Sequence, residues 1–220
     1  FSSGWFMHVQ TLFQETRAQV MHELMQAYSL GSVTFMTPDG MEANSLPIEV
    51  DTSCGEFGTL RFHFGRSNPV RNSLIPGMEA MAVFQGPNAY ISPRWYVAGQ
   101  KSKKVLPSWN FAVVHAYGTP RIVDDETWML KHLAALTAQN ESRRAQPWSL
   151  DEAPVDFVRQ AATHLIGIEI PIRRLVGKWF TSQQRTPADR ASLAGYLRER
   201  PQDLSAAMAS LIEQVDRQDR

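Results

Sequence analysis

Residues 83–123 hold most of the side chains in this chain whose types could act together in binding chemistry. Three lysines fall within four positions, close to hydroxyl groups and tryptophans. Ammonium and hydroxyl groups hold phosphate by charge-assisted hydrogen bonds, and aromatic rings stack on flat ligands. The stretch therefore predicts a pocket for a flat, anionic ligand, lined by Tyr90, Ser92, Lys101, Lys103, Lys104, Ser108, Trp109, Asn110 and His115.

Each of these groups also has a structural interpretation. The three lysines are typical of a solvated hairpin tip. Tryptophans at strand spacing, here Trp95, Trp109 and Trp179, are more often part of a core than of a binding site. Arg66 follows Gly65 and is a second candidate for holding an anion. Residue types alone favour the structural interpretation for the lysines and the tryptophans.

Motifs for nucleophilic catalysis, dinucleotide binding and metal binding are absent from the sequence. There is no Gly-x-Ser-x-Gly or Gly-x-Gly-x-x-Gly, and Cys54 has no local histidine partner. His63 and His115 have no second ligand at metal spacing, so no metal and no catalytic residue is predicted. With 22 Lys and Arg against 22 Asp and Glu, the chain lacks the basic footprint of an autonomous DNA-binding domain. A local DNA-binding patch stays open.

The length of 220 residues suits one large β domain with helical additions. No apolar run approaches the roughly 18 residues of a transmembrane helix, and no signal peptide is visible, which predicts a cytoplasmic protein. Residues 1–12 are interpreted as an N-terminal arm or a tag remnant. The sequence predicts a β domain over 13–185, with a helical insertion at about 124–165, and C-terminal helices over 186–220.

Short aromatic-rich runs, cut by Gly and Pro, predict a β-barrel with flanking helices, an α+β fold. We expect turns at Gly86-Pro87 and Gly118-Thr119-Pro120, and inward faces at Leu130 and Leu133 of one helix and Phe157 of the next. Thr16 and Gln19 are a plausible capping pair for the first helix. Strands are expected at about 30–37, 41–50, 59–64, 79–85 and 165–175, with about three more in the central stretch, and helices at about 15–27, 69–74, 124–138, 151–165, from 186, and 202–215.

The order of several longer motifs resembles the PaiB family of FMN-binding negative transcriptional regulators. The most specific blocks are FQGPNAYISPRWY at 84–96 and LPSWNF at 106–111. They are accompanied by MEANSLP at 41–47, GRSNP at 65–69, VHAYG at 114–118, GIEIPI at 167–172 and GKW at 177–179. The similarity runs collinearly from about Phe13 to Arg190.

This resemblance implies a flavin-reductase-like split β-barrel that forms a homodimer with FMN at the subunit interface. It also implies repression of transcription. Because the net charge is zero, either direct or indirect repression stays open. Lys178, Trp179, Ser182 and Gln183 are expected to reach the partner's site by analogy with split-barrel oxidases. The implied phosphate ligands are Arg66, Lys103, Lys104 and Ser108, and the implied flavin or ribityl contacts are Asn44, Ser45, Tyr90, Ser92, Trp109 and Asn110.

Three positions depart from the family pattern. The family usually has His where Ser45 stands, Thr where Ser108 stands, and a second basic residue where Phe180 stands. Ser108 keeps the hydroxyl group, whereas the other two changes remove an imidazole and a charge. Two alternatives to a regulator stay open: a flavin oxidoreductase that uses FMN and NAD(P)H, and a haem-binding relative with His63 or His115 as axial ligand.

Overall fold

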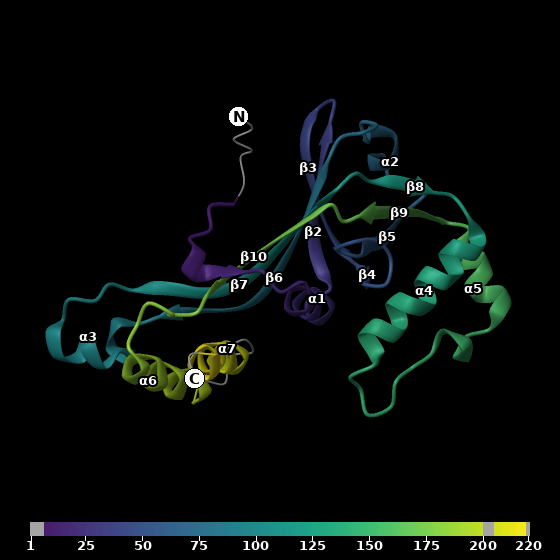
Figure 1. The fold of residues 1–220 in the computed structure, drawn as a ribbon. Helices are drawn as coiled ribbons and strands as arrows, with labels where there is room; N and C mark the ends of the chain where they lie inside the picture. Colours follow the sequence, from purple (N-terminus) through teal and green to yellow (C-terminus); the bar gives the residue numbers. More distant parts are fainter. Residues whose placement is uncertain (1–6, 200–204, 219–220) are drawn as a thin grey trace. The chain divides into compact units, whose positions relative to one another are not determined.

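A computed structural model describes residues 7–199 and 205–218, and the chain divides into two compact units (Figure 1). Unit 1 comprises Phe1–Thr16, Gln85–Val114 and Val176–Arg220. Unit 2 comprises Arg17–Phe84 and His115–Leu175. Each unit is therefore assembled from segments that lie far apart in the sequence.

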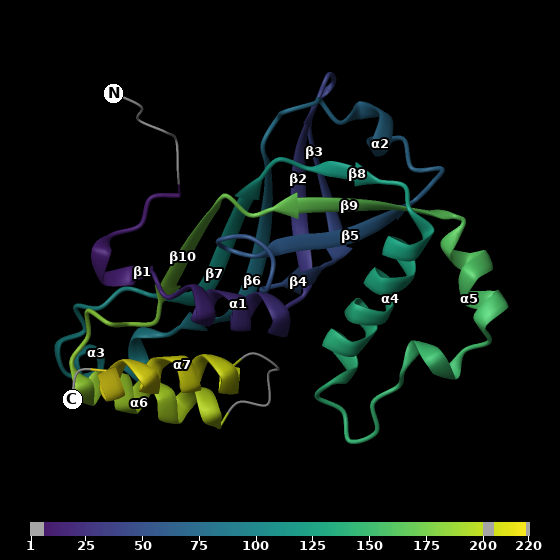
Figure 2. The same cartoon turned by 45° about the vertical axis from the view of Figure 1, so that its right-hand side comes forward.

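Unit 2 contains an antiparallel four-stranded sheet in the order β4-β5-β9-β8 (Figure 2). These strands are β4 (Glu49–Asp51), β5 (Thr59–Gly65), β9 (Leu165–Pro171) and β8 (Arg121–Val123). The unit also holds the hairpin of β2 (Leu30–Thr37) and β3 (Gly40–Pro47), where Gly40 takes a positive φ of 118° that suits glycine. Its helices are α1 (Ala18–Ala27), α2 (Val70–Ser73), α4 (Glu126–Glu141), η3 (Leu150–Glu152) and α5 (Val155–Ala162).

Strict alternation of side chains explains the core of unit 2. Leu60, Phe62 and Phe64 of β5 are buried, and they face the same side as the alternating isoleucines of β9. The residues between them, including Arg61 and His63, necessarily point to the other side of the sheet. This second face is polar, and α4 packs over it through contacts with β4 and β9.

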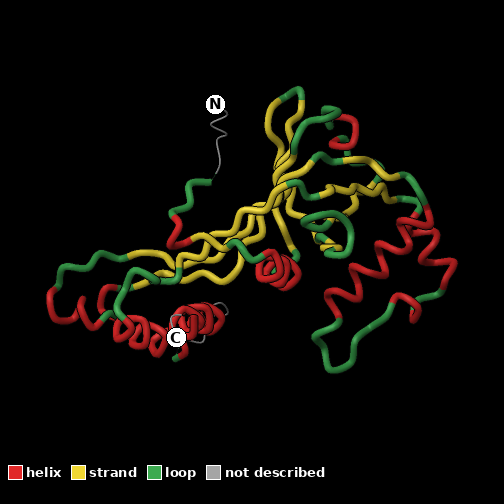
Figure 3. The backbone as a smooth tube through the Cα atoms, in the orientation of Figure 1, coloured by secondary structure: helices red, strands yellow, loops and turns green. Residues whose placement is uncertain are grey.

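Unit 1 contains η1 (Thr11–Phe13), β1 (Gln14–Glu15), η2 (Pro93–Trp95), α3 (Val97–Ser102), α6 (Pro187–Arg198) and α7 (Ser205–Gln218) (Figure 3). It also holds the end of β6 (Ala80–Ile91), the start of β7 (Ser108–Gly118) and most of β10 (Arg174–Phe180). The apolar cluster of the unit joins η2 to the two C-terminal helices. Its largest members are Ile91, Trp95, Tyr96, Leu193, Leu197, Met208 and Ile212.

The expected α+β class with antiparallel strands and flanking helices is confirmed, but the sheets are not closed into a barrel. The remaining strands follow the order β1-β10-β7-β6-β2-β3. Neither this order nor that of the four-stranded sheet returns to its first strand within the described residues, so each sheet keeps two edges.

The helices predicted from about 124 and from 186 and the strand predicted at 30–37 are confirmed. Asp125 caps α4 by accepting a hydrogen bond from the Trp128 backbone N–H at 2.6 Å. Thr186 likewise caps α6, which has Pro187 at its first position. The strand predicted at 30–37 matches β2 at both ends, and Ile166, Ile168, Ile170 and Ile172 are all buried.

Other local predictions are wrong. The expected turn at Gly86-Pro87 is the middle of the long strand β6, and Pro87 lies beyond the Met81–Val83 segment that pairs with β2. On that edge its missing N–H therefore costs no ladder bond. The first helix begins at Ala18 without a side-chain cap, because Gln14–Glu15 form β1 with β10.

The inward faces of two helices also differ from the prediction. In α4 the buried residues are Met129 and His132, since the side of the helix toward the sheet carries polar partners rather than leucines. In α5 Val158 and Ala162 are buried, whereas Phe157 is exposed. Ser149 caps the preceding 3-10 turn, η3, through a capping box with Glu152.

Candidate cofactor site

The lysines of the central stretch lie at the end of a short helix, α3, rather than at a hairpin tip: Lys101 is in its last turn, and Lys103 and Lys104 follow it. Gly99 allows this helix to approach η2, because a Cβ at position 99 would lie 2.1 Å from the carbonyl oxygen of Pro93. Buried Asp189 of α6 accepts a hydrogen bond from the Ala98 N–H at 2.9 Å and so fixes the start of α3. Lys103 ends the helix in the left-handed conformation, with φ 57°. The basic turn is therefore held by specific packing within unit 1.

Lys101, Lys103 and Lys104 are exposed in this turn, and no carboxylate of the described residues forms an ion pair with them. On the neighbouring strands Trp109 and Tyr90 expose 55% and 48% of their surface. Their rings form an edge-to-face pair with centroids 6.2 Å apart. Unit 1 thus presents cations without counter-charges together with exposed aromatic rings, a combination that suits a flat ligand carrying a phosphate.

Asn110 and Ser182, both predicted cofactor contacts, have no exposed surface. Ser182 Oγ lies 2.8 Å from the Tyr96 hydroxyl and accepts a hydrogen bond from Asn110 Nδ2 at 3.0 Å. Tyr96 is buried as well, so three uncharged polar groups satisfy one another inside unit 1. This buried triad of Tyr96, Asn110 and Ser182 fixes the start of β7, beside Trp109, relative to the end of β10.

The residues predicted to reach a partner lie at the end of β10 and in the turn after it. Lys178 and Trp179 belong to β10, and Ser182 and Gln183 belong to the turn. Ser182 has a positive φ of 64°, which is uncommon for a non-glycine residue. The Gln183 side chain braces the turn by accepting from the Thr181 N–H and donating to the Trp179 carbonyl. Lys178 donates to the His8 carbonyl at 3.2 Å and lies over the Phe111 ring. Trp179 and Lys178 are half-buried, and Ser92 accepts from the Arg94 N–H at the start of η2.

Asn44, Ser45 and Arg66 belong to unit 2. Asn44 and Ser45 lie on β3, opposite Val33 and Ser32 of β2. Arg66 forms a two-point ion pair with Asp124 and also donates from Nε to the Thr163 carbonyl at 2.7 Å. Its pKa is raised by the hydrogen bonds to Asp124. The guanidinium group is therefore already engaged by protein groups.

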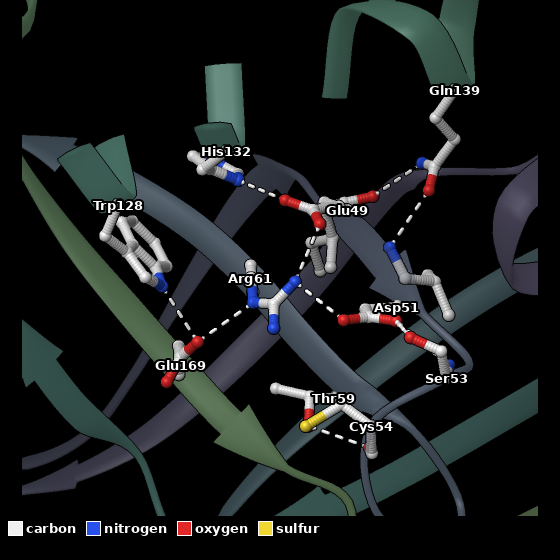
Figure 4. Close-up of polar contacts among 12 residues, drawn as sticks. Glu49, Asp51, Ser53, Cys54, Thr59, Arg61, Trp128, His132, Gln139 and Glu169 are labelled. Atoms are coloured by element: carbon white, nitrogen blue, oxygen red, sulfur yellow. Dashed lines mark hydrogen bonds and ion pairs between the residues drawn. The ribbon is translucent and has the colours of Figure 1, made fainter. Parts of the chain in front are cut away.

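A buried charge cluster in unit 2 was missed by the sequence analysis (Figure 4). Arg61 donates from Nε to Glu169 at 2.9 Å, and its Nη1 lies 3.1 Å from Glu49 and 2.8 Å from Asp51. Burial alone would lower the pKa of Arg61, but the hydrogen bonds to Glu169 and Glu49 raise it. Glu169 also accepts from Trp128 Nε1 at 2.8 Å and from Arg121.

Two histidines continue the charge cluster. His132 Nδ1 lies 2.6 Å from Glu49 Oε2, and His132 Nε2 lies 3.0 Å from His63 Nδ1. Burial, and then the neighbouring His132, lower the pKa of His63 to about 4. One signal in the sequence could have indicated the cluster: three strands place opposite charges at positions that alternate with apolar ones, namely Glu49 and Asp51, Arg61, and Glu169.

The antiparallel α+β fold and the aromatic and basic surface of unit 1 together suit a cofactor-binding protein. Residues 7–174 match the family described as "Putative FMN-binding domain", which is most of the chain. The chain therefore belongs to this FMN-binding family, and FMN is its cofactor.

Two relatives are similar over nearly the whole chain. An uncharacterized protein of Emericella nidulans is 27% identical, with 94% of this chain and 97% of that protein covered. The protease synthase and sporulation protein PAI 2 of Bacillus subtilis is 24% identical, again over 94% of this chain and 97% of the relative. The resemblance to the PaiB family is thereby confirmed.

Solved structures are similar in fold alone. The FAD and haem binding protein of Mycobacterium smegmatis aligns with a TM-score of 0.53 at 14% identity, over 76% of this chain and 73% of that one. The flavocytochrome Anf3 of Azotobacter vinelandii gives the same TM-score of 0.53 at 13% identity, over 84% and 78% of the two chains. Within the described part of the chain, no helix combines the length and the apolarity that crossing a bilayer requires.

Proposed function

We propose that this protein binds FMN on the exposed face of unit 1, as a homodimer with a regulatory role. The observation that carries the proposal is the combination of the exposed Trp109–Tyr90 pair with lysines that lack ion-pair partners in the described part of the chain. The rings offer a surface for the isoalloxazine, and the ammonium groups offer counter-charges for the phosphate. Bound FMN would supply one- and two-electron chemistry.

The residues of this face divide into contacts and supports. Lys103, Lys104 and half-buried Ser108 are assigned to the phosphate, and Tyr90 and Trp109 to the flavin ring. Asn110 and Ser182 have no exposed surface, so they act by positioning their neighbours. Ser92, Lys178, Trp179 and Gln183 stay in the proposal through the resemblance. Asn44 and Ser45 of unit 2 are contacts that the resemblance alone implies, and Arg66 is not assigned to the phosphate, because Asp124 and the Thr163 carbonyl already engage it.

Phe180, where relatives carry a second basic residue, has an aromatic environment of its own. Its ring lies 4.5 Å from that of Phe13 and stacks on Phe111 at 6.0 Å. Loss of the charge therefore leaves the face more apolar and leaves phosphate binding to the lysines of the α3 turn. Electrostatic attraction for the phosphate then depends on a few exposed charges, and salt should weaken it.

We propose that a second copy of this chain packs on the exposed face of unit 1. Leu106, at 81% exposure, extends the apolar surface beside Trp109. Side chains of this kind gather where proteins associate. Repression of transcription is carried over from the PaiB resemblance. With no net charge, the protein is proposed to regulate through its cofactor and partners rather than by strong autonomous DNA contact.

The test is a visible absorption spectrum before and after FMN is added, for the wild type and for the Lys103→Ala, Lys104→Ala double variant. We expect bound-flavin bands in the wild type and binding about 10-fold weaker in the double variant, with the difference shrinking at high salt. Sedimentation of the same samples reports the dimer, and a gel-shift series across salt concentrations reports DNA contact. A wild type that ignores FMN refutes the proposal.

A further inference from the structure

The contact between α4 and the four-stranded sheet of unit 2 is polar, whereas helices usually pack on sheets through apolar side chains. Three side chains of α4 form hydrogen bonds across it: Trp128 with Glu169, His132 with Glu49, and Gln139 with the edge of β4. Asn140 accepts from Ser29, which lies just before β2. Gln139 donates to the Ile48 carbonyl at 2.8 Å and accepts from the Val50 N–H at 2.9 Å, as a neighbouring strand would. The helix is therefore held in part by polar groups, among which His132 and its partners Glu49 and His63 are ionisable.

The proton positions in the Glu49–His132–His63 chain follow from its hydrogen bonds. An ionised carboxylate only accepts, so His132 Nδ1 carries the proton that Glu49 receives. The Nε2 atom of neutral His132 then accepts from His63 Nδ1. His63 Nε2 is left as the basic end of the chain. If both rings carried two protons, two N–H groups would face each other across 3.0 Å, and the bond between the rings would be lost.

The charged groups around these rings come from every element packed there. In the described part of unit 2 they are Glu49 and Asp51 of β4, Arg61 of β5, Arg121 of β8 and Glu169 of β9. Three carboxylates thus face two guanidinium groups in the cluster. Burial and the neighbouring His132 oppose a proton on His63 while the rings stay packed, which lowers the pKa of His63.

We propose that the Glu49–His132–His63 chain is a proton-operated clasp that holds α4 on the sheet at neutral pH and releases it in mild acid. Release exposes the His63 ring to water, where its imidazole can take up a proton. Trp128 stacks on His132 with ring centroids 5.1 Å apart, so opening the clasp also disturbs the Trp128 contact with Glu169.

The direction of the pH effect follows from proton binding in the two states. His63 has a pKa of about 4 in the closed state, against the ordinary value of 6.5 once it is exposed. The closed state binds fewer protons between these values, so its stability is complete above pH 6.5 and declines as the pH falls toward 4. From His63 alone, opening of α4 at pH 5 should be about 30-fold more frequent than at pH 7.5.

The experiment is amide hydrogen exchange of α4 on the full chain from pH 7.5 to 5, corrected for the intrinsic effect of pH on exchange. In the wild type we expect about 30-fold loss of protection in α4 and little change in α6. In His63→Asn the amide can still donate to His132 but cannot titrate, so most of the loss should disappear. His115→Asn is the matched control, because His115 is also half-buried in unit 2 with a pKa lowered by burial, yet lies outside the clasp.

Two results would overturn the clasp. One is α4 protection that stays constant from pH 7.5 to 5 in the wild type. The other is a pH profile of α4 opening that stays as in the wild type in His63→Asn, or that disappears in the control variant His115→Asn. Should His63→Asn fold poorly, an NMR titration of the wild-type imidazoles decides: the clasp requires His63 to take up its proton in the same pH range in which α4 loses protection.

Discussion

Units 1 and 2 place their cations in different surroundings. Unit 1 leaves the lysines of the α3 turn and the Trp109–Tyr90 pair exposed, while its buried triad of Tyr96, Asn110 and Ser182 is uncharged. Unit 2 gathers its charges into one cluster, with Arg61 among three carboxylates under α4. A charge with protein partners serves the fold, whereas a charge without them is available to a ligand. Each prediction below tests one side of this contrast.

The largest effect is expected for Arg61→Met. Its removal leaves Glu49, Asp51 and Glu169 close together without a shared cation, and breaking such a pair costs about 3–5 kcal/mol. Since 22% of the Arg61 side chain is exposed, we expect a value near the lower end, about 3 kcal/mol, in urea unfolding. A loss below about 1 kcal/mol would mean that water, not Arg61, stabilises these carboxylates.

Gly167→Ala should have the next largest effect. A Cβ at position 167 would lie 2.2 Å from the Trp128 ring, so the ring must shift away from its hydrogen bond to Glu169. Such overpacking costs about 1–3 kcal/mol in the free energy of unfolding. Gly195→Ala in α6 is the control, since no atom lies within 4 Å of its added Cβ. That variant should be neutral or slightly stabilised, as alanine favours helices.

Tyr96→Phe tests the uncharged side of the contrast. It removes the hydroxyl at 2.8 Å from Ser182 and should cost about 1 kcal/mol. No charge is involved, so the same cost is expected at pH 5 and pH 8, unlike the acid sensitivity expected in unit 2. Thermal unfolding at both pH values measures it, with exposed Tyr90→Phe as the control. A cost that changes with pH would contradict the contrast.

Arg66→Ala should have the smallest effect on cofactor binding. The resemblance implies that Arg66 holds phosphate, but its guanidinium already pairs with Asp124 and the Thr163 carbonyl. FMN affinity should therefore change by less than about twofold, since the ion pair is exposed and offers no free donor fork. Equilibrium titration of the variant checks this. A 10-fold loss would show that FMN displaces Asp124.

The sequence predicted the structure correctly where the residue pattern of a single strand or helix end was sufficient. The alternating isoleucines of β9, the Asp125 cap of α4 and the Thr186-Pro187 start of α6 all follow from local pattern. The continuous strand through Pro87 could not be predicted, because tolerance of proline depends on which neighbours pair with that part of β6.

Long-range pairing also concealed the charge cluster. Glu49, Arg61, Trp128, His132 and Glu169 are distant in the sequence, and only strand register brings Arg61 opposite both Glu49 and Glu169. Each residue alone is typical of a solvated surface. In the same way, burial of Asn110 and Ser182 depends on a contact between two strands and a turn that composition cannot indicate.

The most direct test of the account is an FMN titration, followed by quenching of flavin fluorescence, of the wild type, Trp109→Ala and Trp148→Ala. Both tryptophans are exposed, at 55% in unit 1 and 43% in unit 2, so they differ mainly in their surroundings. We predict wild-type affinity for Trp148→Ala and about 10-fold weaker binding for Trp109→Ala, equivalent to about 1.4 kcal/mol. Wild-type affinity in Trp109→Ala, or equal losses in both variants, would contradict it.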